Sequence, residues 1–276
     1  MKHFFYVLIV FTALTSCSEY QKALKAEDIA TKFKMGETLY KAGKYAKANK
    51  LFAQIVPSYR GKPQAEKLMY LYSDSFFQMG DYYVSGYQFN RFASSYPKSE
   101  KLEDASFLSA KSAYFLSPVY SKDQKETKEA IEKLQEFINL YPESKYATEA
   151  SKLVQELDFK LEKKAFSIAK QYNRISDYPS SVRSFDNFIF EFPGSTLREE
   201  ALFYRLDSAY RLAINSVEYK RTIQNGLIKL KKERLETAKE YSNVFKKSFK
   251  DSKYLEDVNN MLAAIDEQLK NYSTKS

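Results

Sequence analysis

The tetrapeptide Tyr96-Pro97-Lys98-Ser99 recurs along this chain and sets the order of its elements. Two full copies and two weaker ones share its aromatic-first pattern: Tyr141-Pro142-Glu143-Ser144, Phe192-Pro193-Gly194-Ser195, Phe249-Lys250-Asp251-Ser252 and Tyr59-Arg60-Gly61-Lys62. Because proline cannot donate a hydrogen bond into a continuing helix, the pattern predicts that a helix ends at each copy. The serine can then cap the next helix through its side-chain oxygen. The chain is therefore expected to be a succession of helices.

The residues before each copy also repeat, with one small residue followed by two large ones at helical spacing. The small residues, twelve positions before the proline position, are Ala48, Ser85, Ala130, Ser181 and Ala238. The large residues, eight and five positions before it, are Phe52, Phe89, Leu134, Phe185, Ile55, Phe92, Phe137, Phe188 and Phe245, with Ser242 as the exception. A helix of this kind lets a neighbour approach closely at the small residue and fills the remaining space with the large ones.

Together with tight turns at Gly43-Lys44-Tyr45 and Gly80-Asp81-Tyr82, this pattern resembles the tetratricopeptide repeat. We expect an all-α fold: a right-handed superhelix of about five tetratricopeptide-like helical hairpins plus a C-terminal capping helix. The expected segments are units 29–63, 64–100, 101–145, 146–196 and 197–252, a cap at 253–271 and a disordered tail at 272–276. Since no Gly-, Ser- or Pro-rich linker divides the units, they are expected to form one continuous solenoid over 29–271.

The later units are longer than the roughly 34 residues of a bare repeat. Residues 117–123 interrupt the third unit between its helices, and residues 218–226 lengthen the fifth. Residues 147–174 contain neither Gly nor Pro, which predicts either one long helix or two nearly continuous ones.

The N-terminus has the pattern of a secretory signal. Lys2 and His3 precede an apolar run over 4–14, which is too short to remain as a membrane-spanning helix. The run ends in Leu14-Thr15-Ser16-Cys17, which resembles a bacterial lipobox. That resemblance implies a signal peptide at 1–16, a lipid including palmitate on Cys17, and a lipid-anchored tether at 17–28.

An ordinary signal with a chance cysteine is the alternative interpretation. The lipobox is favoured because Cys17 is the only cysteine of the chain and stands where a lipobox requires it. Ser18 follows it in place of the aspartate that retains many lipoproteins at the inner membrane, so the resemblance implies the outer membrane.

Composition excludes several kinds of chemistry. The only histidine, His3, would leave with the signal, and the only cysteine would carry lipid. The mature chain therefore cannot build a Cys/His pair, a Ser-His-Asp triad or a nitrogen–sulfur zinc site, and it has no Gly-rich phosphate loop. We expect no enzyme, no metal and no cofactor beyond the covalent lipid. Glycan cleavage by a carboxyl group with a raised pKa stays open.

The net charge of +9 is spread over runs in which acids interleave. This pattern fits solvated helix faces, an acidic protein partner or anionic lipid headgroups better than nucleic acid, which we do not expect as a partner.

A candidate peptide-binding groove follows from the phase of the first helix in units one to three. Repeat arrays bind ligands on their concave face. The residues expected there are Phe33, Glu37, Tyr40, Lys41, Tyr70, Asp74, Phe77, Phe107, Lys111 and Tyr114. Rings that alternate with charges suit an extended peptide rich in aromatic residues, with Lys41 or Lys111 available for a terminal carboxylate. Alternatively, each ring packs against the neighbouring repeat and serves only the core.

The lipobox, the short tether and five such repeats together resemble the BamD family, the lipoproteins of the outer-membrane β-barrel assembly (BAM) machinery. Residues 141–150 (YPESKYATEA), the basic helix through 160–163 and the segment 206–211 carry the local likeness. The resemblance implies a non-catalytic scaffold that is lipid-anchored in the outer membrane and faces the periplasm. It also implies two partners: a BamA-like β-barrel insertase, bound through its periplasmic domains, and unfolded outer-membrane proteins.

The long fifth unit departs from shorter members of that family, which puts its C-terminal contacts in doubt. A nutrient-uptake lipoprotein is less favoured, since such proteins use Trp to stack sugars and this chain has no Trp. A generic tetratricopeptide lipoprotein that serves cell division or envelope maintenance would have much the same sequence. It is the main alternative, ahead of an enzyme that cleaves peptidoglycan.

Overall fold

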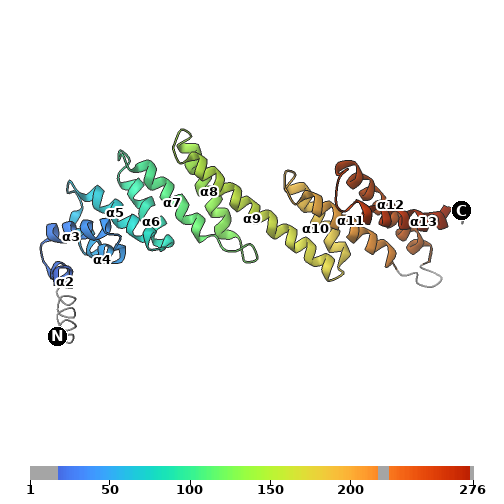
Figure 1. Cartoon of the computed structure of the whole chain (residues 1–276), viewed down its shortest axis with the longest axis horizontal. Helices are drawn as coiled ribbons and strands as arrows, with labels where there is room; N and C mark the ends of the chain where they lie inside the picture. Colours follow the sequence, from blue (N-terminus) through green and yellow to red (C-terminus); the bar gives the residue numbers. More distant parts are fainter. Residues whose placement is uncertain (1–17, 217–223, 274–276) are drawn as a thin grey trace, which may run out of the picture. The chain divides into compact units, whose positions relative to one another are not determined.

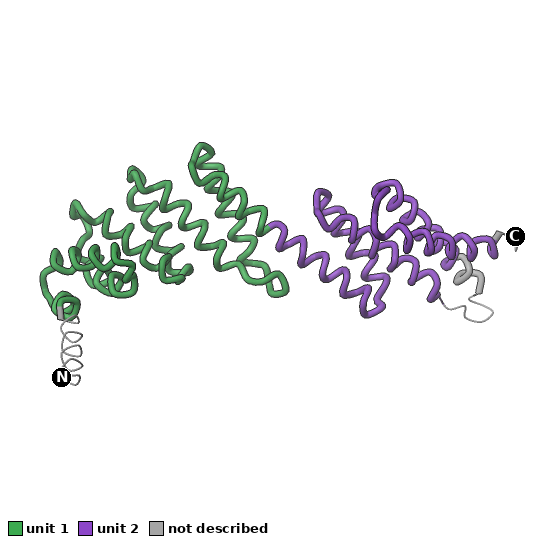
Figure 2. The backbone as a smooth tube through the Cα atoms, in the orientation of Figure 1, with its two compact units in different colours: residues 1–157 green, residues 158–276 purple. Residues whose placement is uncertain are grey.

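The computed structural model describes residues 18–216 and 224–273. Over these residues the chain forms twelve α-helices and one 3₁₀ turn, with no strand (Figure 1). The prediction of an all-α repeat fold is confirmed, while the right-handed course of the superhelix stays a prediction. The chain divides into two compact units, residues 1–157 and residues 158–276, which Figure 2 colours separately.

In unit 1 each helix packs mainly against the next one along the chain. Its elements are α2 (Ser18–Lys25), α3 (Ile29–Lys41), α4 (Tyr45–Ile55), η1 (Val56–Tyr59), α5 (Ala65–Gln78), α6 (Tyr82–Ser95), α7 (Leu102–Leu116), α8 (Lys125–Leu140) and the first part of α9 (Ala147–Arg174).

Unit 2 contains the rest of α9 and four more helices, which also pack in order. These are α10 (Tyr178–Glu191), α11 (Arg198–Ile214), α12 (Gln224–Ser248) and α13 (Leu255–Ser273). Helix α9 is a single helix of 28 residues, which settles the choice left open by the absence of Gly and Pro. The grouping of the helices into five units and a cap stays a prediction.

The small and large residues of the repeats form the core. All fifteen positions, Ser242 included, have exposed fractions of 3% or less. Where the small residue is a serine, a serine of the next helix satisfies its hydroxyl: the Oγ atoms of Ser85 and Ser112 lie 3.2 Å apart, and those of Ser181 and Ser208 lie 2.8 Å apart. A buried hydroxyl without such a partner would destabilise the fold, so these pairs permit serine at a fully buried position.

The prediction that the serine of the tetrapeptide caps the next helix is wrong in detail. Helix α7 begins after its N-cap residue Lys101, and Ser99 accepts a hydrogen bond from the backbone N–H of Lys101 at 2.9 Å. The residues after Pro97 first form a separate turn, in which the N–H of Ser99 donates to the carbonyl of Tyr96. The serine therefore shapes the turn that precedes the helix.

The same serines connect consecutive hairpins of unit 1. The hydroxyl of Ser99 donates to Glu66 at the start of α5, and the hydroxyl of Ser144 donates to Glu103 at the start of α7, both at 2.5 Å. Each of these carboxylates lies in a first turn, where the helix dipole also favours a negative charge.

Tight turns within the hairpins need the left-handed backbone region. Gly43 and Gly80 adopt φ values of 70° and 78°, and Ser176 occupies the corresponding turn before α10 with φ of 64°. For a residue with a side chain this conformation costs about 1–2 kcal/mol, so the third turn is strained where the first two are not. Asp81 and Asp177 then cap α6 and α10 through backbone N–H groups three residues ahead.

Both ends of the described chain are helical. Within the segment assigned to the tether, α2 buries Ala23 and packs Tyr20 and Leu24 against the first core cluster. At the other end α13 extends to Ser273, and Tyr272, assigned to the tail, packs against the last core cluster. The signal peptide and Cys17 lie outside the described residues. Along the part of the chain that the structure describes, no helix has both the length and the apolar character needed to cross a bilayer.

Close packing inside the first hairpin depends on Gly36, and this gives a testable prediction. A Cβ atom at Gly36 would lie 2.5 Å from Cε1 of the fully buried Phe52 ring. Gly36→Ala should therefore lower the free energy of unfolding by about 1–3 kcal/mol, even though alanine is the better helix former. Urea unfolding followed by circular dichroism measures this change.

Gly194→Ala is the matched control. A Cβ atom there meets no heavy atom within 4 Å, so its effect should stay within about 0.5 kcal/mol. Equal stabilities for the two variants would contradict the close approach of α3 to Phe52.

Candidate functional site

The ten candidate residues lie on α3, α5 and α7, the first helices of three successive hairpins in unit 1. The structure joins most of them to the next first helix along the chain, through hydrogen bonds, ion pairs and ring contacts. The face predicted from the repeat phase is therefore largely the surface where one hairpin meets the next.

Two of the candidate rings belong to the core. Phe33 has an exposed fraction of 5% and stacks on Tyr59, with ring centres 5.6 Å apart. Phe107 has an exposed fraction of 2% and stacks on Tyr146 at 4.4 Å. Their assignment to a ligand-facing groove is corrected on this ground, because almost none of either ring is available to a ligand. The alternative reading, that they pack against a neighbouring element, describes both.

Tyr40 and Asp74 connect α3 to α5. The hydroxyl of Tyr40 donates to the carboxylate of Asp74, which is buried with an exposed fraction of 5%. Gln78 also donates to this carboxylate, at 3.3 Å to each oxygen. Burial and the nearby Asp74 charge both raise the pKa of the Tyr40 hydroxyl above its ordinary value. These two residues form a polar link between hairpins rather than an isolated acid that could act in catalysis.

Tyr70 and Phe77 are the two candidate rings on α5, and both are half-buried. Tyr70 packs edge-on against Phe89 and Phe92, and Nζ of Lys101 lies 5.5 Å from its ring centre. Burial, followed by the charge of Asp104, raises the pKa of Tyr70. Phe77 packs edge-on against Tyr82 and against Phe115 of α7. Both rings keep part of their surface exposed while they tie helices together.

The two charged candidates on α3 differ. Glu37 pairs with Lys67 of α5 at 2.5 Å between Oε1 and Nζ. Lys41, at the C-terminal end of α3, is exposed and has no partner among the residues that the structure describes. Of the ten candidates, Lys41 is therefore the one whose charge is not used within the fold.

Lys111 and Tyr114 connect α7 to α9. Nζ of Lys111 lies 2.7 Å from Glu149 and 5.5 Å from the ring centre of Phe107. The hydroxyl of Tyr114 donates to Glu156 at 2.6 Å. That hydrogen bond, together with burial, raises the pKa of Tyr114 to about 12. Lys111 is therefore less free for a terminal carboxylate than Lys41.

A further link of this kind was missed by the sequence reasoning. Asp104 of α7 accepts a hydrogen bond from the hydroxyl of Tyr146 at 2.6 Å. It also forms an ion pair with Lys101 at 2.7 Å. Burial acts to raise the pKa of Asp104, but these donors and Lys145 outweigh it, and the pKa is lowered. Matching opposite charges and hydroxyls at equivalent positions of consecutive units would have indicated such pairs.

The arrangement suits binding more than catalysis. Over residues 18–216 and 224–273, no three His, Cys, Asp or Glu side chains gather in a way that could hold a metal ion. Its carboxylates are occupied by tyrosine and lysine partners. What the face offers a ligand is a series of half-exposed rings beside ion pairs and one unused cation.

Comparison with known proteins gives a family. A family model described as "Outer membrane lipoprotein" (YfiO) matches residues 25–227, which is most of the chain. Among curated proteins, the outer membrane protein assembly factor BamD of Rickettsia prowazekii (strain Madrid E) is 28% identical over 187 residues. That alignment covers 67% of this chain and 73% of the relative.

The link between Tyr40 and Asp74 gives a prediction for stability and its pH dependence. Tyr40→Phe removes a donor from a buried carboxylate and should lower the free energy of unfolding by about 1–3 kcal/mol at neutral pH. Because the folded-state pKa of Tyr40 lies above its ordinary value of 10.0, its contribution is complete below pH 10 and is lost as the pH rises above that value. The variant should therefore lose less stability than the wild type between pH 9 and pH 11.

Urea unfolding at both pH values measures the two effects. Tyr83→Phe is the control, since Tyr83 is exposed on α6, and it should stay within about 0.5 kcal/mol of the wild type. Equal pH dependence of the wild type and Tyr40→Phe would show that this hydroxyl does not link α3 to α5.

Proposed function

This chain belongs to the YfiO family of outer membrane lipoproteins, and we propose that it acts in the assembly of β-barrel proteins in the outer membrane. The observation that carries the proposal is the family match over residues 25–227, together with the similarity to a protein named as an outer membrane protein assembly factor. Neither the family description nor the name of that relative refers to catalysis. The protein is a non-catalytic lipoprotein.

In the proposed arrangement, Cys17 carries the lipid that holds the chain at the outer membrane, and the helical repeats extend into the periplasm. Lipidation by more than one acyl chain makes such an anchor stable. Two features support this placement: the lipobox-like sequence ending at Cys17, and the start of the helical fold directly after it, with α2 packed onto α3. The lipid on Cys17 would therefore hold the helical repeats close to the membrane surface, without a long flexible spacer.

We further propose that the repeats bind two partners: a BamA-like insertase through its periplasmic domains, and unfolded outer-membrane proteins. The substrate surface is assigned to the face of α3, α5 and α7 in unit 1. Tyr70 and Phe77 supply partly exposed rings there, and Glu37, Asp74, Lys111 and Tyr114 hold the helices in place. Aromatic side chains of an extended segment can pack on such rings.

Lys41 has a specific role in this proposal. It is exposed beside Tyr40 and carries a charge that no described residue neutralises. An ammonium group in this position can pair with the terminal carboxylate of a bound substrate segment. Phe33 and Phe107, which are buried, take no part.

Depletion and complementation test both levels of the proposal. Depletion of the lipoprotein from its parent bacterium should lower the amount of folded β-barrel proteins in the outer membrane. The wild type and Lys50→Glu should restore that amount, because Lys50 is exposed on α4, away from the proposed surface. Lys41→Glu should restore about half or less, because it places a negative charge beside the substrate carboxylate. The readout is the ratio of folded to unfolded barrel protein, which migrate differently in gel electrophoresis of unheated samples.

The two possible failures are distinct. If depletion leaves folded barrels unchanged, the assembly role is wrong. If depletion lowers them and Lys41→Glu restores them as well as Lys50→Glu, the assembly role stands and the assignment of Lys41 is wrong.

A further inference from the structure

Unit 1 contains a groove on a different face of α7 from the one that carries the candidates Phe107, Lys111 and Tyr114. Helix α7 packs against both α6 and α8, and a cavity of about 890 Å³ lies above it between the other two. A second cavity of 380 Å³ continues the first and shares Asn90, Ser109 and Lys133 with it. We call this feature the α7 groove: its floor is Ser106, Ser109 and Ala113 of α7, and its walls are Tyr83, Tyr87 and Asn90 of α6 and Glu126, Lys133 and Glu136 of α8.

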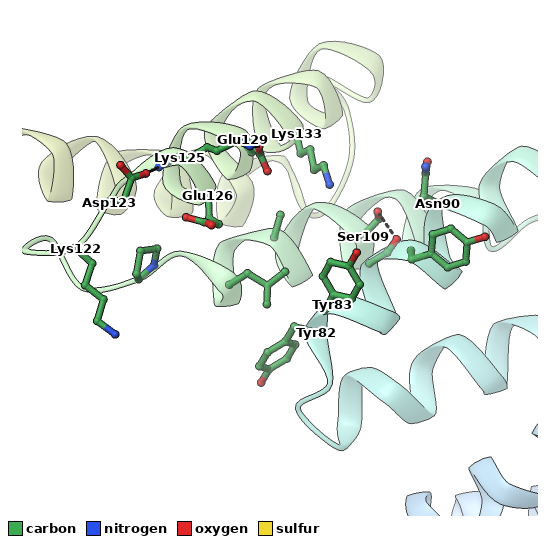
Figure 3. Close-up of a pocket in the computed structure, with 15 residues that line it drawn as sticks. Tyr82, Tyr83, Asn90, Ser109, Lys122, Asp123, Lys125, Glu126, Glu129 and Lys133 are labelled. Atoms are coloured by element: carbon green, nitrogen blue, oxygen red, sulfur yellow. Dashed lines mark hydrogen bonds and ion pairs between the residues drawn. The ribbon is translucent and has the colours of Figure 1, made fainter.

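The walls of the groove differ in character, as Figure 3 shows for its labelled residues. The α6 wall is uncharged, and its tyrosines are among the most exposed rings of the described chain: Tyr83 has an exposed fraction of 77% and Tyr87 one of 63%. The α8 wall carries Glu126, Glu129 and Glu136 against Lys125 and Lys133, and Lys122 and Asp123 line the end of the groove before α8. Of the three glutamates only Glu129 has an ion-pair partner within the described chain, Lys125 at 3.9 Å.

The floor is open because α7 departs from the repeat at specific positions. Counted twelve residues after the proline position, α7 has Ser109, whereas α5 has Tyr72 and α11 has Arg205. Counted nine residues after it, α7 has Ser106, whereas α5 has Met69 and α11 has Leu202. Small side chains therefore stand at both positions of α7, where α5 and α11 have large ones, whereas α9 has Ser151 at the position nine residues after the proline and Val154 at the position twelve residues after it.

Those large residues show what normally fills the space. In unit 2, Nη1 of Arg205 donates to Asp186 of α10 at 2.9 Å, and its guanidinium lies 3.8 Å from the ring centre of Tyr241 of α12. Arg205 thereby bridges the two helices that flank α11. In unit 1, Tyr72 packs against the first core cluster.

The backbone of α6 also makes room. Gly86 faces α7, and its carbonyl accepts a hydrogen bond from the hydroxyl of Ser109 at 3.1 Å. The corresponding positions of α8 and α10, eleven before the proline, are Ile131 and Val182. A Cβ atom at Gly86 would lie 3.3 Å from Cβ of Ser112, so glycine at this position lets α6 pack closely on α7.

We propose that the α7 groove is a docking site for a helix of a partner protein, one that turns small apolar residues toward α7 and lysine or arginine toward α6 and α8. The groove follows α8 from Glu126 to Leu140, a length of roughly 21 Å at 1.5 Å per residue, which suits a partner helix of about four turns. Helix-in-groove binding reads apolar anchors at spacings of three and four residues, and the small floor residues at 106, 109 and 113 match that spacing.

The basic character of the partner follows from two independent features. Unpaired Glu126 and Glu136 on the α8 wall attract cationic side chains. The exposed faces of Tyr83 and Tyr87 on the opposite wall also bind ammonium and guanidinium groups, through cation–π contacts. An acidic helix would meet three glutamates on the α8 wall, where Lys125 already pairs with Glu129, and no cation on the α6 wall. This inference concerns a face that the proposed substrate surface does not use and does not depend on that surface.

The test uses the full chain in detergent micelles and two fluorescent helical peptides of sixteen residues. Both carry alanine and leucine along one face; one has lysines on its flanks and the other has glutamates at the same places. Anisotropy titration should give a dissociation constant at least tenfold lower for the lysine peptide.

Ser109→Arg fills the groove with the residue that the chain itself uses at the corresponding position of α11. It should weaken binding of the lysine peptide at least tenfold. Gln155→Arg, which adds the same charge at an exposed position of α9, should leave binding unchanged. Circular dichroism of each variant establishes that its helices are retained.

Glu126→Gln with Glu136→Gln gives a reading that does not depend on how Ser109→Arg folds, since both positions are exposed. This double variant should reduce the preference for the lysine peptide at least threefold. Equal binding of the two peptides, no saturable binding up to about 1 mM, or an unchanged preference in the double variant would each overturn the proposal. Concentration-dependent dimerisation that Ser109→Arg abolishes would overturn it too, because the occupant would then be a second copy of this chain.

Discussion

The fold depends on one interaction, the insertion of large side chains from each second helix beside a small residue that lets the next helix approach. Ala48 with Phe52 and Ile55 does this on α4, and Ala130 with Leu134 and Phe137 does it on α8. A hairpin of two helices cannot bury its apolar face alone, so this contact has to be made at every step of the array. The packing is close, and a methyl group added at Gly36 would require the Phe52 ring to shift.

A second set of contacts acts on top of that packing and fixes how successive hairpins of unit 1 meet. Serines after the prolines donate to glutamates of the preceding hairpin, as Ser99 does to Glu66. Further along the same helices, Tyr40 reaches Asp74 and Tyr114 reaches Glu156. Individually such bonds contribute about 1 kcal/mol, but they are directional, and apolar packing is not. These hydrogen bonds therefore favour one relative position of the packed helices over slightly shifted ones.

The division between what the sequence predicts and what it does not follows from these two layers. The core positions were predictable because apolar burial repeats with a fixed spacing, and even Ser242, the exception in the pattern, is buried where the register places it. The phase of each first helix placed the ten candidates on α3, α5 and α7, and the site itself stays a prediction. The phase did not distinguish the face turned to a ligand from the face turned to the next hairpin, and so it placed Phe33 and Phe107 in a groove. Partners such as Glu149 and Glu156 lie on α9, 38 and 42 residues further along the chain than Lys111 and Tyr114, and their pairing depends on insertion lengths that a single sequence does not translate into distances. The α7 groove could be recognised only in the structure, because the small side chain of Ser109 is informative only by comparison with Tyr72 and Arg205 at the corresponding positions.

Departures from the repeat are therefore the places where function can be read in this molecule. In this protein the space above Ser109 is open, and no described residue neutralises the charge of Lys41. The central claim, that the array is a scaffold of β-barrel assembly, is tested most directly by copurification. A tagged form of the lipoprotein, isolated from mildly solubilised outer membranes and analysed by mass spectrometry, should bring with it a large β-barrel protein that has repeated periplasmic domains. Recovery of a nutrient transporter or of division proteins, with that barrel protein absent, would contradict the account.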